Sequence, residues 1–243
     1  MIENMKGIFI DLDDTLINFG GVTRESWRLT CEKMISEYPD ISIDPVNLAN
    51  KITNISDAYW ADEDIRPKGN VDYRKLRTEI ISQACRELNI VISKDALAYL
   101  LDSYAFNKEE AIYLFPNVYE TLKTLREKGH KLVLITNGNS ERQRGKIERF
   151  DLEKYFDLIL IEGEQEFGKP DIRVYEKAID FCEISKNQAC MVGDNYLWEV
   201  ETPIKYGMNG VWVNIKDTPL PEQTTVKPDL IIQNISELLK YMK

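Results

Sequence analysis

The fold of this chain is most constrained by a series of short, continuously apolar segments that alternate with helical patterns. Each run is too short for a core helix, and continuous apolarity is typical of a strand buried on both faces of a parallel sheet. We therefore predict an α/β fold in which helices flank a parallel sheet. The runs span residues 7–10, 131–135, 158–161, 189–192, 211–213 and 230–232.

Two helices of the sheet region can be located from their apolar spacing and their end signals. One spans 117–128 and stops at Gly129, because glycine readily adopts the left-handed conformation that ends a helix. The other spans 171–182 and follows Pro170.

The segment between the first and second runs, residues 17 to about 115, contains no convincing strand. It is far longer than an ordinary connection, and its apolar residues recur at helical spacing. We predict two domains: an α/β core of residues 1–16 plus 113–243, and a helical domain of residues 17–112 inserted after the first strand. Four helices are expected in the insert, beginning near Thr23, Pro45, Asp72 and Ser93.

Charge and composition limit the partners and the location. The 243 residues carry a formal net charge of −10, which argues against nucleic acid or an anionic membrane, since both favour a basic surface. Neither a signal-peptide pattern nor an apolar run of about 18 residues is present, so we expect a cytoplasmic protein. The oligomeric state, monomer or homodimer, stays open.

The cysteines and the histidine exclude several kinds of site. Four cysteines lie far apart without CxxC spacing, and we expect buried thiols rather than disulfides or zinc ligands. His130 is the only histidine and is expected in a surface loop between a helix and a strand. We therefore exclude a Ser-His-Asp triad and a histidine metal site.

Polar side chains follow four of the predicted strands, and their types indicate an anion-binding crevice. Ligands of an open parallel sheet bind outside the carboxyl ends of its strands, so these side chains should converge. Buried carboxylates need a cation, here a lysine and, we infer, a divalent metal ion. The residues, in strand order, are Asp11, Asp13, Thr136, Asn137, Lys169 and Asp194.

The same positions carry a family resemblance. In order along the chain, "DLDDT", "TNG", "GKP" and "GD" resemble the four signature motifs of the haloacid dehalogenase (HAD) superfamily. Each motif is common by chance, whereas four in order at strand ends are specific. The resemblance implies a Rossmann-like core, and the helical insert is similar to the C1-type cap of this family.

Phosphoryl transfer explains why two aspartates would end the first strand. A carboxylate can act as the nucleophile and form an aspartyl-phosphate, which divides one difficult step into two. Asp11 fits this role, and the resemblance assigns it the same one. Asp13, two residues further on, would protonate the leaving alkoxide and then activate water.

The other strand-end residues fit charge neutralisation. Asp11, the carbonyl of Asp13 and Asp194 offer hard oxygen ligands for Mg²⁺. Thr136 would donate a hydrogen bond to a phosphoryl oxygen, and Lys169 would supply a fixed cation. Asn137 is a candidate phosphate or substrate ligand, with a turn residue before Gly138 as the alternative.

One motif departs from the family pattern. The fourth motif is commonly GDxxxxD, whereas "GDNYLWE" places Glu199 where the second aspartate is expected. The extra methylene changes the reach of this carboxylate toward the metal ligands or Lys169. Pro203 lies where the family has a helix, which is tolerable only if that helix begins near Thr202 with Pro203 in its first turn.

The expected reaction is hydrolysis of a small phosphate monoester by a magnesium-dependent phosphatase. The resemblance supports this because dehalogenase members lack an acid at the position of Asp13. A phosphomutase of the same fold and a phospholigand-binding protein without turnover remain alternatives. The substrate, a small phosphorylated metabolite, is not specified. Candidate contacts in the insert, with a solvent-exposed amphipathic face as the alternative, are Trp60, Arg66, Lys68, Tyr73 and Arg74.

Overall fold

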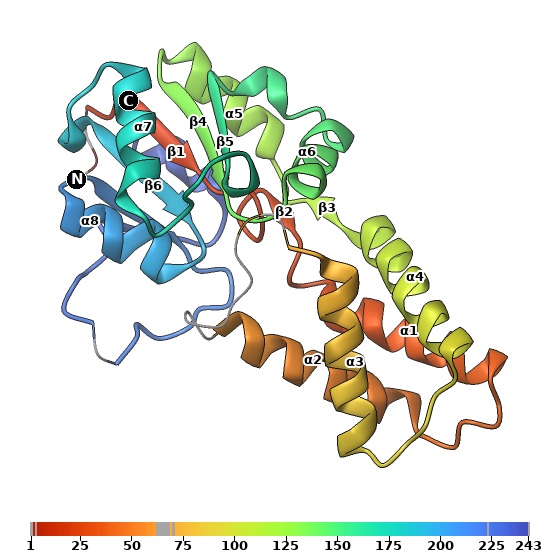
Figure 1. The fold of residues 1–243 in the computed structure, drawn as a ribbon. Coiled ribbons are helices and arrows are strands. Elements are labelled where there is room, and N and C mark those ends of the chain that lie inside the picture. Colours follow the sequence, from red (N-terminus) through yellow and green to blue (C-terminus); the bar gives the residue numbers. More distant parts are fainter. Residues whose placement is uncertain (1, 3, 62–68, 70, 223, 243) are drawn as a thin grey trace. The chain divides into compact units, whose positions relative to one another are not determined.

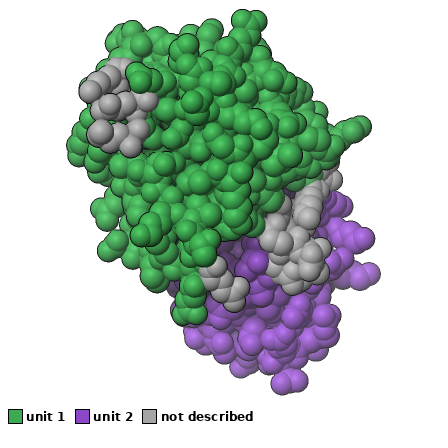
Figure 2. Space-filling view, turned by 90° about the vertical axis from the view of Figure 1, so that its left-hand side faces the viewer, with its two compact units in different colours: residues 1–18, 68–70, 114–243 green, residues 19–67, 71–113 purple. Residues whose placement is uncertain are grey.

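The structure is a computed structural model that describes residues 2, 4–61, 69, 71–222 and 224–242 (Figure 1). The chain divides into two compact units (Figure 2). The sheet unit comprises Met1–Asn18, Lys68–Asn70 and Leu114–Lys243, and the helical unit comprises Phe19–Pro67 and Val71–Tyr113.

The sheet unit is built on six parallel strands in the order β5-β4-β1-β6-β7-β8. The central strand β1 (Gly7–Ile10) pairs with β4 (Lys131–Thr136) on one side and with β6 (Ala189–Gly193) on the other (Figure 1). The outer strands are β5 (Leu158–Ile161), β7 (Asn209–Val213) and β8 (Leu230–Ile232). All six apolar runs are therefore strands, and the predicted α/β fold is confirmed.

The strand order reverses beside β1, and this positions the site. The chain runs outward from β1 through β4 to β5, and then returns to β6 on the opposite side of β1. Such a reversal opens a crevice at the carboxyl ends of the central strands, because the connections leave in opposite directions.

Helices cover the sheet by burying one apolar stripe each. Helices α5 (Val118–Glu127) and α7 (Ile172–Cys182) match the predicted ranges to within one residue at each end. Buried residues of α7 pack with Phe9, Val133 and Met191 of the sheet. Helix α6 (Ser140–Arg149), which the sequence analysis did not predict, follows β4. Short 3₁₀ segments occupy Glu153–Tyr155, Glu162–Glu164, Lys186–Gln188 and Ile235–Lys240.

The segment around Pro203 meets the condition that the sequence imposes. Helix α8 (Thr202–Tyr206) carries the proline in its first turn, where the missing N–H is harmless. A π-helical segment, Tyr196–Glu201, precedes it.

The helical unit contains α1 (Thr23–Glu37), α2 (Pro45–Ala61), α3 (Tyr73–Glu87) and α4 (Lys94–Ala111), near the predicted starts. Asp72 and Ser93 cap α3 and α4 by accepting hydrogen bonds from backbone N–H groups. These bonds satisfy donors that the first helical turn leaves unpaired. The unit has its own apolar core, which includes Trp27, Met34, Ile52, Ile81 and Leu100.

A two-stranded ribbon lies where the chain leaves the sheet unit after Asn18 and where it returns at Leu114. Strand β2 (Ile17–Asn18) pairs with β3 (Tyr113–Leu114), so the expectation that residues 17 to about 115 contain no strand is wrong at the two ends of that segment. The backbone N–H of Phe115 also donates to the carbonyl of Leu16 at 2.9 Å. Within the part of the chain that the structure describes, no helix has the length and apolarity needed to cross a membrane.

The cysteines are buried and free, as expected, but the expectation for His130 is wrong. His130 is only 8% exposed. Its Nδ1–H donates to the carbonyl oxygen of Met5 at 2.9 Å, which anchors the α5–β4 turn to the segment before β1. Nε2 is buried and has no hydrogen-bond partner among the described residues. Burial therefore lowers the pKa of His130, with the charge of Lys128 acting in the same direction.

His130 should make the protein less stable in mild acid. Because its folded-state pKa lies below the ordinary 6.5, the unfolded chain binds the proton more readily. Stability should therefore be full above pH 6.5 and should fall as the pH drops toward the folded-state pKa. His130→Asn, which keeps a donor for Met5, should flatten this dependence in urea unfolding between pH 5 and 7.5. A wild-type profile unchanged by the substitution would contradict the assignment, since the chain has one histidine.

Candidate active site

The turn after β1 places Asp11 and Asp13 at the end of the central strand. The backbone N–H of Asp11 donates to the carbonyl of Val192 at 2.9 Å, which extends the pairing with β6 by one residue. The chain then turns sharply: Asp14 has a φ of 58° and donates its N–H to the carbonyl of Ile17 at 2.7 Å. Aspartate tolerates this left-handed conformation better than most residues. Asp14 is thus a turn residue.

Lys169 is the buried cation that meets Asp11. Its Nζ lies 2.5 Å from Oδ1 of Asp11 and 2.7 Å from Oε1 of Glu199, and the residue is 1% exposed. The three side chains come from the end of β1, from the loop after β5 and from the π-helical segment after β6. A buried ion pair is tolerable only when such contacts compensate for lost hydration.

Asn137 holds the backbone of Lys169. Its Nδ2 donates to the carbonyl of Lys169 at 2.6 Å, and its Oδ1 accepts from the Lys169 N–H at 2.9 Å. This pair of hydrogen bonds fixes the loop that carries the cation. Asn137 therefore lies within the site as a support for Lys169, and its predicted contact with the substrate stays a prediction.

Glu199 reaches Lys169 despite its extra methylene. It lies in the π-helical segment after β6, and its side chain packs against Gly193. A Cβ on Gly193 would overlap the Cγ of Glu199 and lie 3.0 Å from the Cβ of Asp11. The glycine of the "GD" pair is thus required by close packing between two carboxylate side chains.

The site contains more negative than positive charge. Burial raises the pKa of Asp11, and Lys169 opposes this rise. Burial likewise raises the pKa of Glu199 to about 7. The pKa of Asp194 is well above its usual value because of burial and then because of Glu199 and Asp11. Burial lowers the pKa of Lys169, but the negative charges of Asp11 and Glu199 outweigh this effect, so the pKa is raised. Lys169 therefore carries a positive charge and faces the carboxyl groups of Asp11 and Glu199.

The donor set is suited to a small divalent cation. Oε2 of Glu199 is buried without a hydrogen-bond partner among the described residues. Over that part of the chain, no three His, Cys, Asp or Glu side chains are grouped so that they could hold a metal. Mg²⁺ commonly uses only one or two carboxylates, with water and phosphate oxygens completing its shell. Asp11, Asp194 and the backbone carbonyl of Asp13 match that requirement.

Asp13 contacts a second buried lysine, which the sequence analysis missed. Nζ of Lys146 lies 2.8 Å and 2.7 Å from the two carboxylate oxygens of Asp13. Nε2 of Gln143 donates to Oδ2 of Asp13 at 3.2 Å and to Oγ1 of Thr136 at 2.5 Å. Both residues lie on the buried side of α6. Their spacing of three in a helix directly after "TNG" is the signal that could have identified them.

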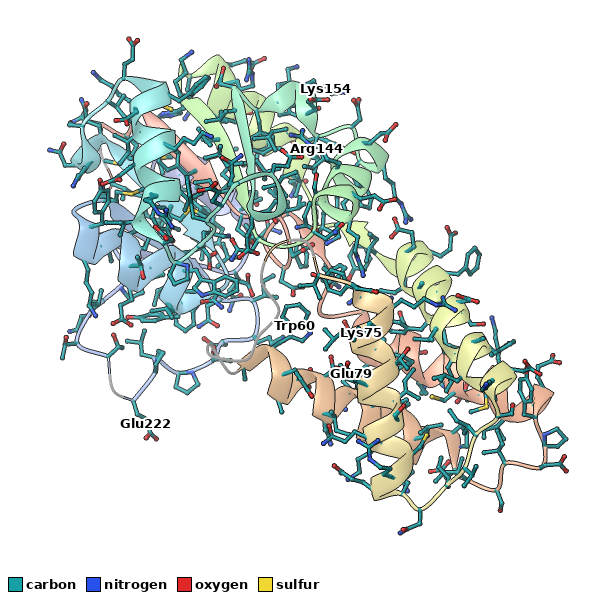
Figure 3. The ribbon with its side chains drawn as sticks, viewed as in Figure 1. Trp60, Lys75, Glu79, Arg144, Lys154 and Glu222 are labelled. Atoms are coloured by element: carbon teal, nitrogen blue, oxygen red, sulfur yellow. The ribbon has the colours of Figure 1, made fainter. Side chains whose placement is uncertain are left out.

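Arg144, labelled in Figure 3, lies on the exposed side of the same helix and pairs with Glu164 at 2.7 Å. The opposite side of α6 therefore faces the strand ends with one cation and one amide.

The candidate residues of the helical unit are only partly described. Trp60, labelled in Figure 3, lies at the end of α2 and is 41% exposed. Its ring stacks on that of Tyr73 at a centroid distance of 6.2 Å. Arg74 pairs with Asp102 on an exposed surface. Arg66 and Lys68 lie outside the described residues. These contacts fit both predictions for the insert, a substrate-contacting face and a solvent-exposed face.

Comparisons with known proteins agree with the motifs. The family model of haloacid dehalogenase-like hydrolases matches residues 5–202. N-acylneuraminate-9-phosphatase of Mus musculus is 26% identical, and the match covers 98% of this chain and 93% of that protein. (S)-2-haloacid dehalogenase 4A of Burkholderia cepacia is 28% identical, with 69% of each covered. A HAD hydrolase of Bacillus subtilis, solved bound to magnesium, has a TM-score of 0.76 at 19% identity, with 98% of each chain covered. With a family model that spans most of its length, this chain belongs to the haloacid dehalogenase-like hydrolases.

Proposed function

We propose that the protein is a magnesium-dependent phosphatase that hydrolyses small phosphate monoesters through an aspartyl-phosphate on Asp11. The observation that carries this proposal is the second carboxylate, Asp13, which Lys146 and Gln143 hold beside the strand end that presents Asp11. A relative similar over nearly the full length is named a phosphatase, which supports the same reaction.

Asp11 and Asp13 divide the reaction between them. Asp11 attacks phosphorus in its ionised form, which the ammonium of Lys169 at 2.5 Å favours. Asp13, which is partly exposed and first takes up a proton from solvent, gives that proton to the departing alkoxide and then takes one from the water that cleaves the aspartyl-phosphate. The hydroxyl of Thr136 donates to a phosphoryl oxygen, while Lys169 offsets part of the negative charge.

The leaving group decides between a phosphatase and a dehalogenase. A halide departs as a stable anion and needs no proton, whereas the alkoxide of a phosphate monoester needs one. Asp13, held by two hydrogen-bonding side chains, can supply the proton that a phosphate monoester needs. Displacement of a halide does not require such an acid. We therefore favour phosphate esters over haloacids.

Magnesium is the cofactor that these residues fit. The ligands would be Asp11, Asp194 and the backbone carbonyl of Asp13. When bound, Mg²⁺ neutralises phosphate charge and keeps the anionic substrate and Asp11 from repelling each other. The raised pKa of Asp194 supports this assignment, because a cation relieves crowding among carboxylates.

The helical unit would act as a cap that selects the leaving group, with Trp60 and Tyr73 as candidate contacts. A small phosphorylated metabolite is the proposed partner, since a net charge of −10 disfavours nucleic acid and anionic membranes. The buried free thiols are compatible with the reducing cytoplasm. Turnover of a panel of phosphorylated metabolites by the purified protein would identify the substrate.

Metal dependence should be assignable to Asp194. The purified protein should hydrolyse p-nitrophenyl phosphate with Mg²⁺ and lose activity in EDTA. Asp194→Ala should raise the Mg²⁺ concentration needed for half-maximal rate by at least about 10-fold. Even a residue that only hydrogen-bonds a metal ligand typically changes metal affinity by about that factor. Asp180→Ala, at an exposed position on α7, is the matched control and should leave it unchanged. Turnover of 2-haloacids but not phosphate esters, or indifference to EDTA, would contradict the proposal.

A further inference from the structure

Lys146 is buried far more deeply than an ordinary helix lysine. Its side chain is 4% exposed, whereas the Asp13 side chain that it contacts is 27% exposed. Burying an ammonium group costs hydration energy, so its placement needs a compensating contact. Both oxygens of Asp13 provide it, at 2.8 and 2.7 Å. The carboxylate is thus held from the protein interior, and the rest of its surface remains accessible.

Gln143 connects this ion pair to Thr136, and the hydrogen bonds determine how its amide is oriented. The ammonium group of Lys146 can donate hydrogen bonds but cannot accept them. The atom of Gln143 that lies 2.7 Å from Nζ must therefore be the carbonyl oxygen Oε1. The NH₂ end then faces Oδ2 of Asp13 and Oγ1 of Thr136. Lys146 therefore sets the direction of the amide as well as the position of the carboxylate.

The amide also controls what the hydroxyl of Thr136 can do. Oγ1 of Thr136 accepts a hydrogen bond from Gln143 at 2.5 Å, so one of its lone pairs is occupied. A hydroxyl that accepts in this way keeps its own proton for another acceptor. A phosphoryl oxygen in the crevice would be such an acceptor, and Thr136 would act there only as a donor.

From these contacts we infer that Lys146 and Gln143 are positioning residues for the reaction: Lys146 orients Asp13 for proton transfer, and Gln143 orients Thr136 for phosphoryl binding. This inference rests on the proposed phosphatase function. It adds a buried polar pair on α6 to the strand-end residues. Neither side chain is required to touch the substrate, since each acts through the residue that it holds.

The experiment distinguishes a loss of Asp13 orientation from a general loss of structure in the site. Lys146→Met removes the charge and retains the length of the side chain. In single-turnover experiments with Mg²⁺, phosphoenzyme formation from an alkyl phosphate should slow by about 10- to 100-fold, because an alkoxide needs the proton of Asp13. Formation from p-nitrophenyl phosphate should slow by less than about 3-fold, because nitrophenolate leaves unaided. KM should change little, and Lys146→Arg should restore part of the alkyl rate.

Arg149→Met, at the exposed end of the same helix, is the matched control and should leave both rates unchanged. If thermal unfolding shows that Lys146→Met does not fold, the same measurements are made on Gln143→Met, which replaces an uncharged side chain. That variant should raise KM for both esters through Thr136 and should slow the alkyl ester more than the aryl ester.

Failure of this inference is distinguishable from failure of the proposed function. A wild-type protein without phosphate-ester turnover would overturn both. An active wild type in which Lys146→Met loses equal factors on the two esters, or loses nothing, would overturn the positioning role alone. If Gln143→Met is used instead, an unchanged KM together with equal losses of rate on the alkyl and the aryl ester would also overturn the positioning role.

Discussion

Asp11→Asn should reduce phosphatase turnover by about four orders of magnitude or more, because it removes the nucleophile and leaves every other group in place. Asparagine has nearly the same size as aspartate, and its oxygen can still accept from Lys169. Lys169 also keeps Glu199 as an ionic partner at 2.7 Å. The variant should therefore fold, and the loss should appear in kcat rather than in the amount of folded protein.

Two measurements check this expectation. The first is steady-state hydrolysis of p-nitrophenyl phosphate with Mg²⁺. The second is acid-quench trapping of phosphate on the protein, which should label the wild type and not the variant. Asp180→Asn, an exposed carboxylate on α7, should behave as wild type in both. Turnover near the wild-type rate in Asp11→Asn would disprove the covalent mechanism.

Lys169→Met should affect stability as well as activity. It leaves the buried carboxylates of Asp11 and Glu199 without their shared cation, and breaking a buried pair in this way costs about 3–5 kcal/mol of unfolding free energy. Activity should be lost too, since neither the nucleophile nor the phosphoryl group would then face a fixed positive charge.

The stability loss should grow with pH. With Lys169 present, the pKa of Glu199 is already raised to about 7, mainly by burial. Without the opposing lysine, this pKa should rise further. A carboxyl group whose folded-state pKa is raised binds protons more readily in the folded state, so stability falls as the pH rises from the unfolded-state value through the folded one. Urea unfolding of Lys169→Met should therefore show a smaller deficit at pH 5.5 than at pH 8.

A second substitution tests the electrostatic cause. Lys169→Met/Glu199→Gln removes one of the two unpaired charges, so it should recover part of the stability at pH 8 without recovering activity. Lys177→Met, which removes an exposed lysine of α7, is the matched control for loss of a positive charge. The assignment would fail if Lys169→Met unfolded at the same urea concentration as the wild type.

Local pattern determined most of the architecture. All six strands of the parallel sheet were predicted because each is a short, continuously apolar run, a pattern that is typical of parallel strands covered by helices. Asp72 and Ser93 were identified as helix caps because capping depends on residues three positions apart. The strand-end motifs likewise identified Asp11 and Lys169, whose contact the structure shows.

Helix α6 escaped prediction because its buried side is mostly polar. Gln143 and Lys146 face inward beside Ile147, so the segment has no apolar stripe of the usual kind, and Gly145 interrupts it. His130 was misjudged for a related reason: its loop position suggested exposure, whereas the carbonyl of Met5, far away in the chain, accepts its hydrogen bond.

The sequence by itself therefore determined the six strands of the parallel sheet, the helices with apolar stripes and the charged groups that follow β1, β5 and β6. Only the tertiary structure decided that Lys169 pairs with Asp11 and Glu199, and that Asp13 pairs instead with Lys146. Lys169 contacts Asp11 across 158 positions of sequence, and Lys146 contacts Asp13 across 133. Such pairs depend on the order of strands in the sheet and on the side that each helix buries. Local spacing does not fix either, because burial and sheet pairing are properties of the assembled chain.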